Sequence, residues 1–253
     1  MPYQILLPLK TLEPHPNAPQ PRPWHAMVYA WLHAGDAELA RRVHDEMEPK
    51  PFSLAPLKPN GAHAATLAIG LLDDALWEPL RAGLHLEKDF AVQGKWYALA
   101  GEPTVTHCAY EALWSAARAD TSIVLQFLSP TSFHTHGVHY PLPDPALTFQ
   151  SYFLRWNRLA PAALQININL LDAVAAHVVV AQLQVETQAV EFGGYRQVGF
   201  VGRVRFHIKQ SEWIGKEVVR QLNALADFAN YAGTGHKTTQ GMGQTRRLER
   251  QSR

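Results

Sequence analysis

Apolar and polar positions follow two different periods in the first half of the chain. Residues 3–10 (YQILLPLK) form a short apolar run, which predicts a buried strand. From Trp24 onward the apolar positions recur with helical spacing, and a second helix follows that Asp36 can cap. Pro49 and Pro51 end this second helix. The rest of this half predicts two strands, a helix and a hairpin, at residues 51–57, 64–72, 74–84 and 89–110.

The same order of elements is predicted again in the second half. A strand is predicted at residues 122–130 and an amphipathic helix at residues 149–160. Two strands then meet through Gly193 and Gly194, and a long helix is predicted at residues 212–232. The paired strands and the closing segment occupy residues 177–192, 199–208 and 244–249.

Each half therefore has the element order β-α-β-β-α-β, which is that of a ferredoxin-like (RRM-like) unit. The predicted fold class is α+β, with two tandem ferredoxin-like domains and a C-terminal glycine-rich loop. The halves share this order but no sequence repeat. We place the boundary near Arg118–Asp120, which gives an N-terminal domain at residues 1–118 and a C-terminal domain at residues 119–253.

Composition limits the kinds of partner and compartment. The net charge of +1 excludes a generally basic protein, so any nucleic-acid surface is a local patch, and residues 246–253 contain four arginines. Cys108 is the only cysteine, which excludes an intrachain disulfide and a multi-cysteine zinc site. The first residues lack a signal-peptide pattern, and no apolar run reaches the ~18 residues of a membrane helix. These features predict a cytoplasmic protein without a membrane partner.

A glycine-rich stretch near the end of the chain has the composition of a phosphate-binding loop. Its glycines are Gly233, Gly235, Gly241 and Gly243. Neither a Walker loop nor a dinucleotide-binding fingerprint matches this stretch, because the glycine spacing differs and the predicted helix precedes the loop instead of following it. Two interpretations stay open: a flexible turn before an edge strand, or a loop that approaches a nucleic-acid backbone closely because glycine lacks a Cβ atom. In the second, His236, Lys237, Arg246 and Arg247 supply charge.

The sequence resembles the CRISPR repeat-processing endoribonucleases of the RAMP superfamily. The resemblance rests on GTGHKTTQGMGQ after a long helix, on LSPTSF, LPDP and FLRWNRLAP in the middle, and on the stretch at residues 29–57. It implies two tandem ferredoxin-like domains and a metal-independent RNA cleavage that leaves a 2′,3′-cyclic phosphate and a 5′-hydroxyl. It also implies a catalytic site in the N-terminal domain, made by a tyrosine, a histidine and a lysine at Tyr29, His44 and Lys50.

The chemistry of this cleavage needs a base for the 2′-hydroxyl proton, an acid for the departing 5′-oxygen and positive charge near the phosphorane. His44 lies in the last turn of a short helix, where the helix dipole favours an imidazolium. A helix-turn-helix can bring Tyr29 to it, and Lys50 can stabilise developing charge. The alternatives are a core aromatic for Tyr29, a solvated helix residue for His44 and an ordinary surface lysine for Lys50.

Two further groups compete for a role. His134, His136 and His139 lie close together in sequence, which permits a zinc site, although only Asp144 is a nearby acidic ligand; a polar loop that touches RNA is the other interpretation. Arg203 and Arg205 alternate with apolar residues and share one strand face, which suits an RNA platform or an ordinary solvent face.

The sequence thus predicts an endoribonuclease that cleaves precursor CRISPR RNA within its repeats and needs no cofactor or metal. Its expected partners are precursor and mature CRISPR RNA, subunits of a CRISPR effector complex, and no membrane; it is expected to be a monomer or homodimer. The alternative is a catalytically inert RNA-binding RAMP protein or a subunit of an effector complex.

Overall fold

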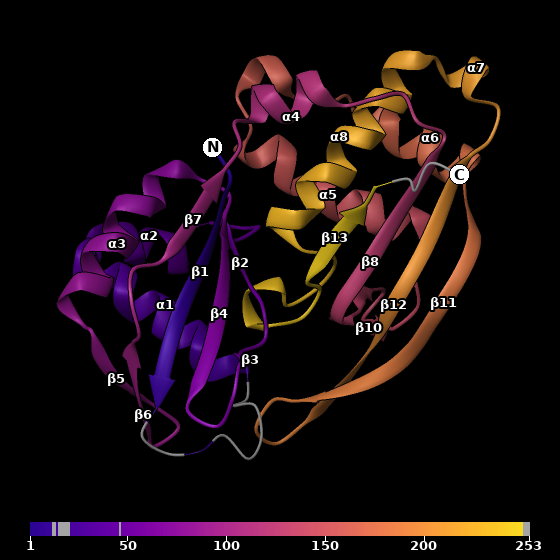
Figure 1. Cartoon of the computed structure of the whole chain (residues 1–253). Coiled ribbons are helices and arrows are strands. Elements are labelled where there is room, and N and C mark those ends of the chain that lie inside the picture. Colours follow the sequence, from indigo (N-terminus) through magenta and orange to yellow (C-terminus); the bar gives the residue numbers. More distant parts are fainter. Residues whose placement is uncertain (12–13, 15–20, 46, 250–253) are drawn as a thin grey trace.

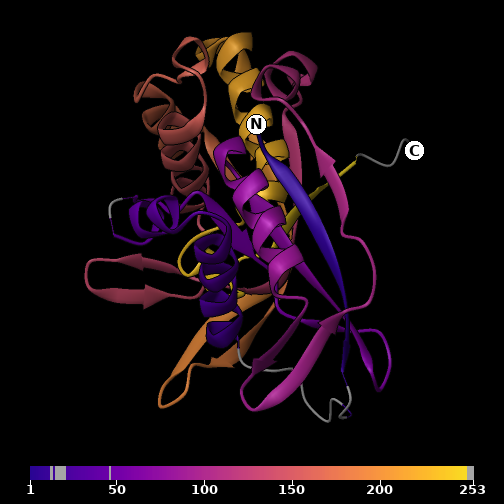
Figure 2. The same cartoon turned by 90° about the vertical axis from the view of Figure 1, so that its left-hand side faces the viewer.

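The computed structural model describes residues 1–11, 14, 21–45 and 47–249 (Figure 1). It is a mixed α+β structure in which each half of the chain has a sheet with helices packed on one face, so the predicted α+β class is confirmed. Figure 2 shows helices α1 (Pro21–Gly35) and α2 (Ala37–Asp45) on the same side of the molecule as a projecting hairpin from the other half.

The N-terminal sheet has β1 at its centre. Ile5, Leu7 and Leu9 of β1 are fully or almost fully buried, whereas the residues between them face the open side, as the two-residue period of a strand requires. The strand order is β2-β4-β1-β6-β5, with β7 also paired to β1 and β3 to β4. These strands are β1 (Tyr3–Thr11), β2 (Phe52–Leu54), β3 (Lys58–Pro59), β4 (Ala64–Leu71), β5 (Asp89–Val92), β6 (Lys95–Leu99) and β7 (Thr104–His107).

Helices α1 and α3 (Trp77–Leu86) cover this sheet and cross each other closely. A Cβ atom on Gly83 would lie 1.8 Å from the carbonyl oxygen of Trp31, so the crossing requires glycine there. Trp24 and Trp31 of α1 are buried in the resulting core with Phe90 of β5. The core thus fixes the orientation of α1, the helix that carries Tyr29.

The C-terminal sheet has the strand order β11-β12-β8-β13. Helices α5, α6 and α8 pack on one face of it, and Trp156 of α5 lies edge-on to Phe228 of α8 in the core. The other face stays open. The elements of this half are β8 (Ser122–Thr131), α5 (Pro145–Leu159), α6 (Asn169–His177), β11 (Val178–Glu191), β12 (Arg196–Ile208), α8 (Lys216–Ala232) and β13 (Thr245–Leu248).

The structure differs from the sequence prediction at several elements. The long helix predicted at residues 212–232 is interrupted, because Gly215 has φ +84° and separates α8 from a short helix. Two helices that the sequence did not indicate, α4 and α6, are present together with a hairpin, since their residues show no clear period. The elements concerned, with the 3-10 turns, are α4 (Tyr110–Ala116), α7 (Ser211–Ile214), β9 (Phe133–Thr135), β10 (Val138–Tyr140), η1 (Asp74–Leu76), η2 (Ala162–Leu164) and η3 (Thr238–Gln240).

The described residues form one hydrophobic cluster in each half. The second cluster includes Tyr110 and Leu113 of α4, which precede the boundary predicted near residues 118–120. The halves meet where α8 ends against the edge of the first sheet. There the Ser53 hydroxyl donates to the carbonyl oxygen of Tyr231 at 2.5 Å, and a Cβ atom on Gly70 would lie 2.2 Å from the same oxygen. No helix in the described part of the chain has the length and apolarity to cross a membrane.

Candidate catalytic site and nucleic-acid interface

Helices α1 and α2 form a hairpin that brings Tyr29 and His44 together. The carboxylate of Asp36 accepts from the backbone N–H of Leu39 at 2.9 Å, which caps α2 and sets the turn between the helices. The rings of Tyr29 and His44 have centroids 5.2 Å apart and are inclined by 75°. Two residues that are 15 positions apart in sequence therefore share one site.

His44 is exposed and is held by a neighbouring carboxylate. Its side chain is 67% exposed, and its Nδ1 atom donates to Oδ1 of Asp45 at 2.7 Å. The hydrogen bond from His44 lowers the pKa of the Asp45 carboxyl. With Nδ1 bonded to Asp45, Nε2 is the other ring nitrogen of His44, and no hydrogen bond to it is found among the described residues.

Lys50 lies against the end of α2. Its ammonium donates to the carbonyl oxygens of His44 at 2.6 Å and Val43 at 3.1 Å, and it pairs with the Glu48 carboxylate at 3.1 Å. These carbonyls have no partner within the helix, so the lysine acts as a C-terminal cap. The sequence-predicted lysine is therefore next to His44, but its amine is engaged by backbone and carboxylate oxygens.

Tyr29 has a half-buried ring and a hydroxyl with no hydrogen-bond partner among the described residues. Burial raises the pKa of Tyr29 to about 12, and the carboxylates of Glu48 and Asp45 add to the increase. The phenol is therefore protonated at neutral pH. A buried hydroxyl without a partner is costly, and a ligand that accepts its proton in a hydrogen bond would remove that cost.

His25 belongs to this site, although it was missed in the sequence. It lies one helical turn before Tyr29 on α1, and the two rings have centroids 5.0 Å apart. Its Nδ1 atom lies 3.0 Å from the carbonyl oxygen of Thr239 in the glycine-rich loop. Burial is the largest cause that lowers the pKa of His25, and the charges of His44, Lys50 and Arg22 lower it further. The i, i+4 spacing to Tyr29 was the available signal.

The four glycines of the C-terminal loop have backbone conformations that favour glycine, and their neighbours leave little room for a Cβ atom. All have positive φ, from +65° at Gly233 to +80° at Gly241. A Cβ atom on Gly243 would lie 2.0 Å from the carbonyl oxygen of Thr234, and one on Gly235 would lie 2.3 Å from that of Ser132. The loop precedes the edge strand β13, and its residues are buried or half-buried between the halves.

Arg155, a second residue that sequence reasoning missed, holds the same loop from helix α5. Its buried guanidinium donates to the carbonyl oxygen of Gly235 at 2.9 Å, to Oγ1 of Thr238 at 3.1 Å and to the carbonyl oxygen of Ser151 at 2.9 Å. It lies within the FLRWNRLAP stretch that suggested the family, which was the signal for it. Burial lowers the pKa of Arg155 to about 10, so the group stays cationic at neutral pH.

Lys237 and His236 lie on the outer side of the loop. The Lys237 ammonium is 4.2 Å from the ring centroid of Phe192 and 4.4 Å from that of Tyr195, and it also donates to the Tyr195 hydroxyl. Burial, followed by the charge of Lys237, lowers the pKa of His236 to about 4. At neutral pH the loop thus presents one cation, held over two aromatic rings, and a neutral histidine.

The β9–β10 hairpin contributes two more histidines beside His236. Its His134 and His139 lie opposite each other, and their ring centroids are 5.5 and 5.6 Å from that of His236. His136 is in the turn and contacts the Thr135 hydroxyl instead. Among the residues that the structure describes, no group of three or more His, Cys, Asp or Glu side chains is arranged to hold a metal ion. The histidines therefore form a polar cluster.

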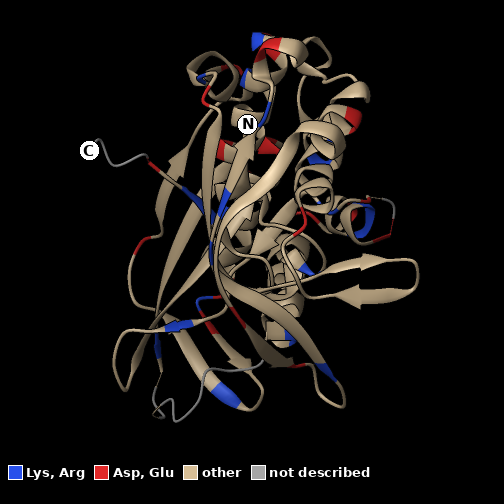
Figure 3. Ribbon diagram, turned by 90° about the vertical axis from the view of Figure 1, so that its right-hand side faces the viewer, with Lys and Arg blue, Asp and Glu red and all other residues tan. Residues whose placement is uncertain are grey.

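The predicted arginines separate into two sets. Arg203 and Arg246 each pair in register with Gln126 on the central strand β8, and Arg205 shares their face of the sheet. Figure 3 shows the Lys and Arg positions spread over several elements of the ribbon. Arg247 has a different position: its side chain is 17% exposed and bonds to Asp227, Asn223 and Asp120. It stabilises the packing of β13 on α8 and is not part of the open face.

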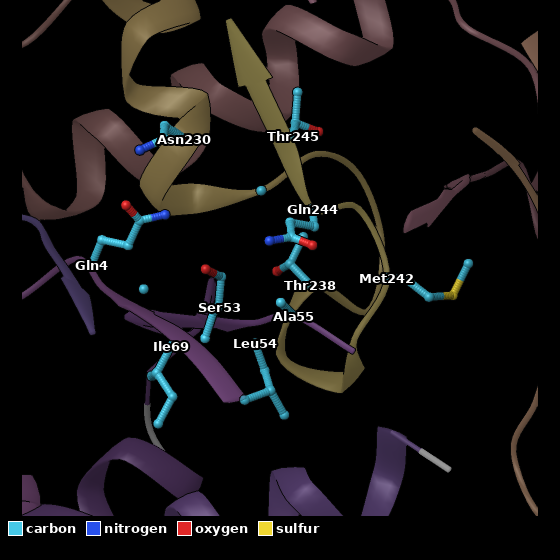
Figure 4. A pocket seen from close by; sticks show the side chains of 13 residues that line it. Gln4, Ser53, Leu54, Ala55, Ile69, Asn230, Thr238, Met242, Gln244 and Thr245 are labelled. Carbon is cyan, nitrogen blue, oxygen red and sulfur yellow. The ribbon is translucent and has the colours of Figure 1, made fainter. Parts of the chain in front are cut away.

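A small cavity lies at the joint between the halves (Figure 4). The side chains of Gln4, Ser53, Asn230 and Gln244 help to line it, and its volume of about 20 Å³ suits one water molecule. The contact between the halves is therefore close, and the glycine-rich loop has a fixed position relative to α1.

The chain resembles solved structures of CRISPR-associated RNA-processing proteins over almost its whole length. A Cas6 product complex has 26% sequence identity and a TM-score of 0.86, with 98% of this chain and 100% of that chain covered. Cas6 from Thermus thermophilus has 28% identity and a TM-score of 0.75, with 98% of both chains covered. A Cas6 substrate mimic complex has 25% identity and a TM-score of 0.74, with 98% and 99% covered.

The sequence comparisons agree with the structural ones. The family model for "CRISPR-associated endoribonuclease Cas6" matches residues 125–245. The Cas6 endoribonuclease of Streptococcus thermophilus is 26% identical over 138 residues, which are 54% of this chain and 55% of that protein. The Cas6 of Mycobacterium tuberculosis is 26% identical over 122 residues, which are 48% of this chain and 37% of that protein. The matched regions thus span about half or less of these relatives. The chain is thus similar to CRISPR-associated Cas6 endoribonucleases in structure over almost its whole length and in sequence over about half of it.

Proposed function

We propose that the protein is an endoribonuclease that cleaves precursor CRISPR RNA within its repeats without a metal ion. The 2′-hydroxyl attacks the adjacent phosphate and leaves a 2′,3′-cyclic phosphate and a 5′-hydroxyl. The observation that carries this proposal is the approach of Tyr29 and His44 to 5.2 Å on paired helices beside the glycine-rich loop. RNA binding is supported by relatives of the family, which include Cas6 product and substrate mimic complexes.

In this mechanism His44 donates a proton from Nε2 to the departing 5′-oxygen. Asp45, which accepts from Nδ1 at 2.7 Å, holds the orientation of the ring. Tyr29 is protonated and has an unused hydroxyl, so it donates a hydrogen bond to a non-bridging phosphate oxygen. Lys50 positions His44, because its ammonium donates to the backbone carbonyl oxygen of His44 and places a positive charge near the imidazole.

We further propose that each half is a ferredoxin-like domain, at residues 1–118 and 119–253. The strand orders β2-β4-β1-β6 and β11-β12-β8-β13 support this, since in both sheets the first strand lies between the third and the fourth. In the second domain, RNA backbone would meet Lys237 at the loop and the face that carries Arg203, Arg205 and Arg246.

The test is incubation of the purified protein with labelled repeat RNA from the CRISPR array of its source organism, in excess EDTA. We expect one cut with a cyclic-phosphate end, and no cut when the nucleotide 5′ of the site is 2′-deoxy. An unrelated RNA of equal length serves as the control. Strict dependence on magnesium, or cutting of the deoxy substrate, contradicts the mechanism. Tight binding of the repeat without cleavage would favour an inert RNA-binding protein or effector subunit.

A further inference from the structure

His25 occupies the space between the N-terminal catalytic helices and the glycine-rich loop. Its ring lies face to face with Phe52, with centroids 5.9 Å apart and an interplanar angle of 25°, and edge-on to Tyr29 at 5.0 Å. Because Nδ1 donates to the carbonyl oxygen of Thr239, the neutral ring carries its lone pair on Nε2. A hydrogen bond to the backbone thus selects the tautomer that can accept a proton.

The two histidines of the site lie in opposite electrostatic environments. His44 donates a hydrogen bond from Nδ1 to the carboxylate of Asp45. Burial lowers the pKa of His25, and the charges of His44, Lys50 and Arg22 lower it further. His25 is therefore biased toward the neutral form, which a proton acceptor needs.

Their spacing suits a phosphate between them. Tyr29 contacts both histidines, with ring centroids 5.0 Å from His25 and 5.2 Å from His44, so the histidine centroids are at most about 10 Å apart. The Tyr29 hydroxyl, which lacks a partner in the described structure, belongs to the same group. A phosphodiester bound at this hydroxyl would have His25 toward the glycine-rich loop and His44 toward the end of α2.

We propose that His25 is the general base of the cleavage reaction. This proposal rests on the proposed endoribonuclease function and adds the residue that starts the reaction. The 2′-O–H bond breaks and its proton moves to Nε2 of His25, while the 2′-oxygen forms a bond to phosphorus. The bond from phosphorus to the 5′-oxygen breaks with its electron pair on that oxygen, which takes a proton from Nε2 of His44. The net charge of the enzyme is unchanged, because His25 gains one proton and His44 gives up one.

The experiment compares two substitutions that separate catalysis from anchoring. In His25→Asn, the amide nitrogen takes the place of Nδ1 and can still donate to Thr239, but no base remains. In His25→Ala, both the anchor and the base are lost. We expect both variants to cleave ~10²–10⁴-fold more slowly in single-turnover assays, as loss of a general base implies. Repeat-RNA affinity and the melting temperature of His25→Asn should stay near wild type, and added imidazole should restore part of the His25→Ala rate.

The pH profile gives a second readout. For the wild type, the cleavage rate should rise with pH as His25 loses its proton, below the ordinary pKa of a histidine. The rate should fall again at the pH at which the general acid is deprotonated. His25→Asn should lack the rising part. A His25→Asn variant that cleaves at the wild-type rate, or keeps the rising part, would overturn the proposal and leave His25 as an anchor for the loop. Failure of the wild type to cleave would instead reject the proposed function, and it is seen without any variant.

Discussion

The guanidinium of Arg155 on α5 donates at 2.9 Å to the carbonyl oxygen of Gly235, 80 positions later in the chain. This bond and the one between His25 and Thr239 hold two points of the same loop, four residues apart. The loop lies between the helix that carries Tyr29 and the core of the C-terminal half. Its geometry therefore determines how the helices that carry Tyr29 and His44 lie relative to the second sheet.

Replacement of Arg155 by lysine should destabilise the protein. A single ammonium cannot reach the carbonyl of Gly235, the hydroxyl of Thr238 and the carbonyl of Ser151 together, so buried acceptors lose their donor. We expect a loss of about 2–3 kcal/mol in the free energy of unfolding. Arg158→Lys, at an exposed position of the same helix, is the matched control and should change it by less than ~0.5 kcal/mol. Equal values for the two variants in urea unfolding would contradict this role.

Gly243→Ala should cost more stability than Gly94→Ala. Both glycines have nearly the same φ, +74° and +75°, so the strain of a left-handed alanine is shared, at about 1 kcal/mol. A Cβ atom on Gly94 meets nothing within 4 Å, whereas one on Gly243 would be 2.0 Å from the carbonyl oxygen of Thr234. We expect Gly243→Ala to lose at least ~2 kcal/mol more, measured by chemical denaturation. If the two costs were equal, the loop would have room for a side chain.

Lys237→Ala should weaken RNA binding without a preference among sequences. If its ammonium contacts one phosphate, the slope of log affinity against log salt concentration falls by about 0.7–0.9. Fluorescence anisotropy with repeat RNA at several salt concentrations measures this slope. Lys88→Ala, at an exposed position between α3 and β5, is the control and should leave the slope unchanged. A wild-type slope in Lys237→Ala would mean that the ammonium only packs on Phe192 and Tyr195.

His44→Ala should lower the cleavage rate by ~10²–10⁴-fold while repeat binding stays within a few fold. Asp45→Asn should give a smaller loss, because the ring keeps a hydrogen-bond acceptor beside Nδ1, although a neutral amide replaces the carboxylate. His33→Ala, which removes an exposed histidine from α1, should cleave like the wild type. Wild-type rates in the His44→Ala protein would require another acid for the departing oxygen.

Acid should destabilise the protein through His236. Its pKa falls from 6.5 to about 4 on folding, so between these values the unfolded chain binds more protons than the folded one. Stability from this group is present above pH 6.5 and is lost as the pH falls toward 4. Because His236 is only half buried, we expect an effect on the order of 1 kcal/mol. In His236→Gln the difference in melting temperature between pH 7 and pH 5 should shrink, and an unchanged difference would contradict the assignment.

Local sequence signals were enough for the order of elements and for part of the site. The helix hairpin of Tyr29 and His44 follows from helical spacing and from the Asp36 cap, which act over a few residues. The strands of both halves follow from short apolar runs, so the α+β class was accessible. Interruption of the last long helix at Gly215 was missed, because a lone glycine inside a helical pattern is usually tolerated.

Contacts between segments that are far apart in the sequence could not be predicted from its pattern and are seen only in the tertiary structure. His25 meets Thr239 across 214 positions and Arg155 meets Gly235 across 80, and no periodicity encodes such pairs. Arg246 and Arg247 are neighbours in sequence, yet one faces the open sheet and the other pairs with Asp227, because successive residues of a strand point to opposite faces. Which face is covered depends on where α8 packs. The chain therefore specifies its elements locally, whereas the partners of its charged and titratable groups depend on how the two halves meet.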